Sequence, residues 1–223
     1  MMKRKGEKNM SVLGIVFIKD GIIMSSDSRL TATKTVNGTK QVRALDKLPK
    51  TFLISDIGVG ISYCGNVRVE DKLFHDFIRE FVKNNIKKED TVCTVKEKIF
   101  SIQNRKGTYF VIGGYLDKIP YVYYIHDDTC IRANIGNDNN LRYSSIILGG
   151  DEFPQQYYED SIQGKIKLEL LDVKNGITLA ENFVVTGIQN ADSCGGSINT
   201  LVIQEGAAYW HQCHCDSENI KIG

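Results

Sequence analysis

The sequence predicts an α+β protein whose strands pair mainly in antiparallel order. Two apolar runs lie on either side of Lys19-Asp20-Gly21, and an Asp-Gly turn between such runs is a strong hairpin signal. A second hairpin signal, Asp56-Ile57-Gly58, separates two further short apolar runs. Later, apolar residues recur at helical spacing before β-branched and aromatic runs return. Because two hairpins follow one another, antiparallel sheet is favoured over parallel sheet.

The first part of the chain predicts strands at Val12–Ile18 and Ile22–Met24. The segment Leu30–Arg43 is rich in Thr, Lys, Asn and Gly, which indicates a loop or a twisted pair of edge strands. Thr51–Ser55 and Val59–Cys64 then form the second predicted hairpin.

Two helices are predicted next. The apolar residues of the first share one face and recur at intervals of three and four: Leu73, Phe74, Phe77, Ile78, Phe81 and Val82. The charged residues among them indicate a solvated opposite face, and His75 is interpreted as a surface residue. Asp90 or Thr91 can cap the second helix, which carries Val92, Val95, Ile99 and Ile102.

The middle of the chain contains β-branched and aromatic runs typical of a meander: Tyr109–Tyr115, Tyr121–Ile125 and Cys130–Ile135. Ser144–Leu148 is a further predicted strand, and Asp151–Tyr158 has room for one or two helical turns.

The last part begins with Ser161–Leu171, which fits either a strand, by its alternation, or a helix. Ile177–Ala191 has a helical period, and Ile198–Ile203 and Tyr209–Cys213 are predicted strands.

Composition indicates one globular domain. The 223 residues are 42% hydrophobic and 25% charged, and no linker divides them. A formal charge of +1 without a basic stripe argues against nucleic acid as a partner. No apolar run approaches the length of a membrane span, and residues 1–10 are basic without the apolar core of a signal peptide. A cytoplasmic location is therefore expected.

The cysteines, at positions 64, 93, 130, 194, 213 and 215, lack the density of a disulfide scaffold, so reduced thiols are expected. Only His211-Gln-Cys213-His214-Cys215 could suggest zinc. Because these residues alternate along a predicted strand without a second ligand pair, strand alternation is the preferred interpretation, and no metal is expected.

A run of polar residues, Ser25 to Arg29, follows the second predicted strand. By itself this run indicates a solvated strand-to-loop transition more readily than a site. The whole stretch, with its apolar strand, Asp-Gly turn, second apolar strand and Ser-Asp-Ser-Arg, resembles the opening of proteasome β-type subunits and their bacterial relatives. The resemblance implies a four-layer αββα sandwich of two antiparallel sheets, the N-terminal-nucleophile (Ntn) hydrolase fold. It divides the chain into an extension or propeptide, residues 1–10, and one domain, residues 11–223.

The resemblance also implies a catalytic group. The family's nucleophile is a Thr or Ser whose own α-amine is the base, and this position falls on Ser11. Asp27 matches the family's acid and Arg29 its arginine. The lysine is assigned to Lys47, before an apolar strand pair, although Lys40 is the alternative and the interval from Lys47 to Gly65 is longer than usual. The chemistry is consistent, because a hydroxyl needs a nearby base and an adjacent cation lowers the pKa of an amine.

Further positions match the family less closely. Gly65, at an expected strand-to-helix junction, matches the glycine whose amide binds the oxyanion, where a helix N-terminus would add a favourable dipole. The sequence Leu148-Gly149-Gly150 lacks the serine that the family has there. Asp192 matches the family's C-terminal acid but lies one residue too close to Gly195-Gly196, and Cys194 takes a serine position.

The expected function is cleavage of peptide amide bonds in peptides or unfolded proteins, by Ser11 after removal of residues 1–10. No cofactor is implied, and a homo-oligomeric ring is expected because family members assemble in that way. The sequence does not indicate whether an ATPase partner exists. Two alternatives are a catalytically inactive structural subunit of such a ring and an amidase of the same superfamily that acts on small molecules.

Overall fold

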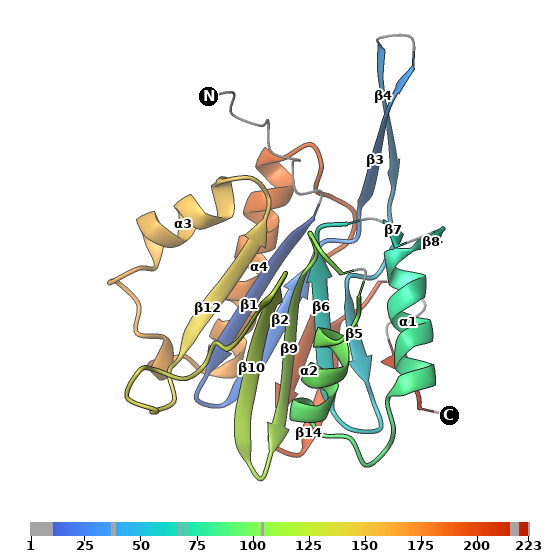
Figure 1. The fold of residues 1–223 in the computed structure, drawn as a ribbon. Helices are drawn as coiled ribbons and strands as arrows, with labels where there is room; N and C mark the ends of the chain where they lie inside the picture. The colour runs from blue at the N-terminus through green and yellow to red at the C-terminus, as the bar shows by residue number, and fades with distance from the viewer. Residues whose placement is uncertain are drawn as a thin grey trace.

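The described part of the computed structural model contains two main β-sheets and four α-helices and comprises residues 11–36, 39–66, 68–69, 71–103, 105–214 and 219–222 (Figure 1). The chain is therefore a mixed α+β protein. Among these residues, no helix is long and apolar enough to cross a membrane.

The five-stranded sheet is antiparallel throughout. In spatial order its strands are β12 (Ser144–Gly149), β1 (Val12–Ile18), β2 (Gly21–Ser26), β13 (Asn199–Gln204) and β14 (Ala207–Gln212). The predicted first hairpin is confirmed, because Ile18 pairs with Gly21 across a two-residue Lys19-Asp20 turn.

The six-stranded sheet departs from the prediction at one edge. In spatial order its strands are β11 (Thr129–Arg132), β10 (Ile119–His126), β9 (Tyr109–Leu116), β6 (Val59–Cys64), β5 (Thr51–Ile54) and β15 (Asn219–Ile220). The expectation of two antiparallel sheets is wrong at this edge, because β15 pairs with β5 in parallel, while the other pairs of this sheet are antiparallel. A long connection between two strands permits this direction, and more than 160 residues separate β5 from β15.

Two small sheets stand apart from the main ones. β3 (Leu30–Val36) and β4 (Thr39–Leu45) pair with each other and with neither main sheet. In Figure 1 this hairpin projects away from the two sheets. Of the two predicted options for this segment, the pair of strands is confirmed. β7 (Arg68–Val69) and β8 (Lys72–Leu73) form the second small sheet.

Two of the four described helices begin at a residue whose side chain caps them. α1 spans Phe74–Asn85, α2 Val92–Phe100, α3 Phe153–Ser161 and α4 Val173–Asn190. Thr91, not Asp90, caps α2, through a reciprocal capping box with Thr94. The Asp172 carboxylate accepts from the Asn175 amide at 2.8 Å, which is why α4 starts four residues before the predicted Ile177. The ambiguous segment 161–171 contains no strand; it includes the end of α3 and a 3₁₀ turn, Leu168–Leu170.

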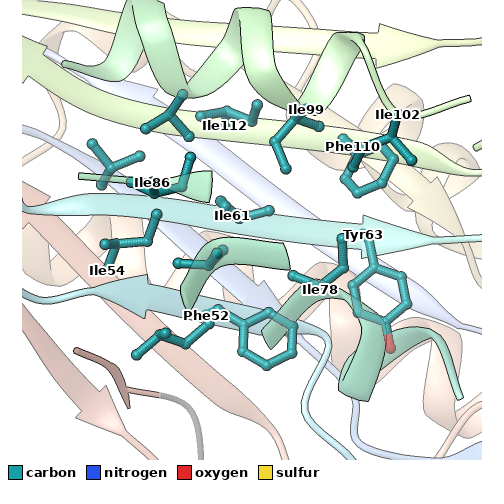
Figure 2. Packing of buried hydrophobic residues seen from close by; sticks show 14 of the residues in the cluster. Phe52, Ile54, Ile61, Tyr63, Ile78, Ile86, Ile99, Ile102, Phe110 and Ile112 are labelled. Atoms are coloured by element: carbon teal, nitrogen blue, oxygen red, sulfur yellow. The ribbon is translucent and has the colours of Figure 1, made fainter. Parts of the chain in front are cut away.

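Three apolar clusters establish the order of the layers. The first lies between the six-stranded sheet and helices α1 and α2, where Ile61 and Phe110 pack with Ile78 and Ile99 (Figure 2). The second lies between the two sheets and includes Leu13, Met24, Val111 and Val122. The third lies between the five-stranded sheet and α4 and includes Val16, Ile23, Ala180 and Phe183. The two sheets are therefore face to face, with helices on both outer sides.

His75 is buried, contrary to the prediction. It lies on α1 but is only 8% exposed, so its interpretation as a surface residue is wrong. Burial lowers the pKa of His75 despite the opposing effect of Asp76. The helix therefore presents a wider buried face than the apolar residues alone indicate.

Candidate active site

The ends of several strands meet at one end of the two stacked sheets. In the five-stranded sheet, the start of β1 pairs with the end of β2 and the end of β12. In the other sheet, β5 starts at Thr51, which pairs with Ser62 near the end of β6. Thr51 Oγ1 donates to Ser26 Oγ at 3.1 Å, which joins the two sheets here.

The polar run at the end of β2 is buried from Ser25 to Ser28, so its interpretation as a solvated transition is wrong. Ser25, Ser26, Asp27 and Ser28 all have 0% exposure. Ser25 Oγ lies 2.9 Å from Thr200 Oγ1, which in turn donates to Glu181 Oε1 of α4 at 2.8 Å. Buried polar groups need partners, and hydroxyls from neighbouring strands and a carboxylate of α4 provide them.

Asp27 is the centre of this buried group. One carboxylate oxygen accepts from the Val12 amide at 2.9 Å and from Lys50 Nζ at 2.6 Å. The other accepts from the Gly195 amide at 3.1 Å. Three donors from three separate segments therefore fix a charged carboxylate directly beside the backbone of the residue that follows Ser11.

The lysine paired with Asp27 is Lys50, so the assignment to Lys47 is wrong. The Lys50 side chain is 3% exposed, and its Nζ also donates to Arg29 O at 2.6 Å. Lys47 is exposed and lies in the left-handed region with φ 70°. Lys40 lies in β4, and its side chain is outside the described part of the chain. The excess interval between Lys47 and Gly65 was the sequence signal for a lysine nearer to Gly65.

Arg29 links the site to two neighbouring segments. Its guanidinium binds Asp46 through two hydrogen bonds, of 2.9 and 3.3 Å, and donates to Cys194 O at 3.3 Å. The hydrogen bond from Arg29 lowers the pKa of Asp46. Arg29 therefore holds the backbone at Cys194, whose neighbour Gly195 donates its amide to Asp27.

The loop before β13 brings Cys194 and Gly195, rather than Asp192, to the site. Asp192 is exposed, whereas Cys194 is 1% exposed. Burial is the main cause that raises the pKa of Cys194 to about 11; Asp27 raises it further and Lys50 opposes it. In the sequence, Cys194 is apparent only as a departure from the family pattern. The structure places it among the residues that surround Asp27.

Gly65 directly follows β6 at the same end of the sheets. It has φ 121°, and a Cβ there would lie 2.3 Å from Gly107 O, so close packing alone requires glycine. The prediction of a helix start immediately after Gly65 is wrong, because β7 and β8 intervene and α1 begins only at Phe74. A helix dipole at Gly65 is therefore not part of the site. Its role as an oxyanion donor stays a prediction.

Ser11 lies immediately before β1 and is 7% exposed. Its carbonyl accepts from the Gly150 amide at 3.1 Å. The extension, residues 1–10, lies outside the described residues. Ser11, Asp27 and Lys50 are thus linked through Val12, whereas Asp192 and Lys47 are exposed.

We expect Gly149→Ala to unfold this corner of the molecule. Gly149 has φ 73°, and a Cβ there would lie 1.7 Å from Ser11 O. The backbone conformation and the collision together should lower the free energy of unfolding by about 3 kcal/mol. Gly58→Ala is the matched control, since Gly58 has φ 63° but no atom within 4 Å of its Cβ. Urea unfolding of both variants tests this, and equal losses would contradict it.

Because two cysteine thiols are buried, we expect the folded protein to lose stability at alkaline pH. The pKa of Cys194 is raised to about 11 from an ordinary value of 9.0, and that of Cys64 to about 12, both chiefly by burial. Unfolded thiols ionise first, so the stabilisation is present below pH 9 and is lost as pH rises toward 11. Cys194→Ala should reduce the loss between pH 9 and 10.5 by about 1–2 kcal/mol. Urea unfolding of the parent protein and of Cys194→Ala at pH 9 and 10.5 measures the difference, and an equal loss in both proteins would contradict the prediction.

The described residues contain no group of three or more His, Cys, Asp or Glu side chains that could hold a metal ion. Within the candidate zinc motif, Cys215 lies outside those residues, so the motif as a whole is not described.

Comparisons with known proteins give no family for this chain: no protein-family model matches it, and a search of curated proteins finds no match.

Proposed function

We propose that this protein is a proteasome-like Ntn hydrolase that cleaves peptide amide bonds with Ser11 as its N-terminal nucleophile. The fold supports the proposal, because two face-to-face sheets with helices outside are compatible with a four-layer αββα sandwich. The proposal also includes a cytoplasmic location, assembly into a homo-oligomeric ring, and peptides or unfolded proteins as substrates.

One observation carries the proposal: the buried Lys50–Asp27 pair lies beside the head of β1. Asp27 contacts the Val12 amide and Lys50 Nζ with the same oxygen, at 2.9 and 2.6 Å. A fully buried ion pair is costly to form and contributes little net stability, so we infer that this pair has a role beyond stability.

In the proposed reaction, Ser11 at a new N-terminus supplies both a base, its α-amine, and a nucleophile, its hydroxyl. Its α-amine, with an ordinary pKa of about 7.7–8.0, takes the proton of its own hydroxyl while the Oγ attacks the substrate carbonyl. The amine then returns the proton to the leaving peptide amine, and an ester to Ser11 forms. Water, activated by the same amine, hydrolyses that ester and releases the acid.

Neighbouring groups have distinct roles in this proposal. The Lys50 cation disfavours a protonated amine nearby and so keeps the base neutral at lower pH. Asp27 holds Lys50 in place, and Arg29 positions the surrounding backbone. The Gly65 amide is the proposed donor to the oxyanion.

The structural-subunit alternative also has a specific observation in its favour. Gly149 and Cys194 stand where the family has serines, and Asp192 is exposed, so the network that supports catalysis in the family is altered. The alternative of a small-molecule amidase shares the same chemistry and differs only in substrate size.

The test compares the full chain with a chain that starts at Ser11, obtained by cutting a fusion protein directly before this residue. Only the second should hydrolyse a panel of fluorogenic peptides. Periodate, which oxidises an unblocked N-terminal serine, provides an independent check by mass that the amine is free. A folded chain with a free Ser11 that is inert toward both peptides and small amides would support the structural alternative instead.

A further inference from the structure

Helix α3 presents an outer face of one charge sign. Among residues 151–164 there are four acidic residues and no lysine or arginine: Asp151, Glu152, Glu159 and Asp160. All four are exposed, and Phe153 at the start of the helix is 37% exposed. The nearest basic residue along the chain, Lys165, donates to the backbone carbonyl of Asp160. The chain as a whole is close to neutral, so this face is a local excess of negative charge with an apolar residue at its start.

The start of α3 lies next to Ser11. The Gly150 amide donates to Ser11 O at 3.1 Å, and α3 begins three residues after Gly150. In Figure 1, α3 lies beside the end of β12, on the outer side of the five-stranded sheet. Whatever chain precedes Ser11 therefore leaves the domain close to the first turn of this helix.

The segment before Ser11 has the opposite charge. Residues 1–10 contain four basic residues, Lys3, Arg4, Lys5 and Lys8, and one acidic residue, Glu7. The segment also contains three methionines, whose flexible side chains adapt to an exposed aromatic ring such as Phe153.

We propose that residues 1–10 dock on the outer face of α3 in their own chain. Ten extended residues reach about 33 Å, whereas a nine-residue helix is about 13.5 Å long, so the whole face is within reach. Lys8, three residues before Ser11, pairs with Glu152, and Lys3 to Lys5 pair with Glu159 and Asp160. Each exposed pair is weak, but the covalent link gives the segment a millimolar effective concentration at this face.

This inference stands whether or not Ser11 is catalytic. If Ser11 is the nucleophile, the docked segment is a propeptide whose removal frees the amine. The charge of the segment then governs how accessible the Met10–Ser11 bond is to cleavage.

Hydrogen exchange of the full chain and of the chain that starts at Ser11 tests the docking. We expect the amides of α3 to exchange at least threefold more slowly in the full chain at low salt, with the difference lost at 0.5 M NaCl. Lys3→Gln, Lys5→Gln and Lys8→Gln together should also abolish the protection, while Glu7→Gln should retain it. These substitutions lie ahead of Ser11.

A second set of variants tests the face itself. Glu159→Gln with Asp160→Asn should abolish the protection, and the matched pair Glu89→Gln with Asp128→Asn, on exposed loops outside α3, should not. Equal exchange of α3 in the two chains would overturn the proposal. Zero-length carbodiimide cross-linking of a mixture of light and heavy isotope-labelled protein distinguishes docking within one chain from docking between two copies. Links from Lys8 to Glu152 within one chain support the proposal. Links only between chains would assign the face to a second copy.

Discussion

Replacement of Lys50 by methionine lowers the free energy of unfolding by about 3–5 kcal/mol, because it leaves the Asp27 carboxylate buried without its cation. The Lys50 side chain is 3% exposed and that of Asp27 is 0% exposed, so water cannot replace the lost partner without local opening. Urea unfolding monitored by fluorescence and circular dichroism measures the change.

The matched control is Lys47→Met, three residues earlier and exposed, which should change stability by no more than about 0.5 kcal/mol. The double variant Asp27→Asn with Lys50→Met should lose less than the sum of the two single losses, because the unpaired charge is gone. A Lys47 variant as damaged as the Lys50 variant, or fully additive losses, would contradict the assignment of the pair.

Substitution of Ser11 by alanine in the chain that starts at residue 11 abolishes peptide hydrolysis, with a loss in kcat/KM on the order of 10³-fold or more. The α-amine and the Lys50–Asp27 pair remain, so the loss isolates the hydroxyl. Ser11→Thr keeps a hydroxyl on the same carbon and should retain measurable activity.

The pH profile separates the amine from other bases. Activity should rise with pH as the Ser11 amine loses its proton, with a midpoint below the ordinary 7.7–8.0 because of the nearby cation. Acetylation of that amine should remove the activity without unfolding the protein. Activity that survives Ser11→Ala, or acetylation, would assign the hydrolysis to another group.

Local signals in the sequence were sufficient for most elements of the fold. The Asp-Gly turn placed the first hairpin, and the helical recurrence of Phe74, Ile78 and Val82 placed α1, because each depends on residues close together in the chain. The parallel β15–β5 pair could not be predicted in this way, since it joins residues more than 160 positions apart.

The candidate site was predicted less well than the fold. Asp27 was identified, but Lys50 was missed because a lysine directly before a strand is ordinarily solvated, and only the tertiary structure shows this one buried. Cys194 was seen as a departure without a role, since its burial depends on contacts with Val12 and α4 that no local pattern encodes.

The two serines at the end of β2 face opposite sides of the five-stranded sheet. Ser25 bonds toward α4 through Thr200 and Glu181, whereas Ser26, the next residue, bonds toward the opposite sheet through Thr51. Since successive strand residues face opposite ways, insertion of a single residue between Met24 and Ser25 would exchange the two directions. Ser26 would then face α4 and lose its hydrogen bond with Thr51, so the length of this strand, and not only its composition, determines whether its hydroxyls join the two sheets.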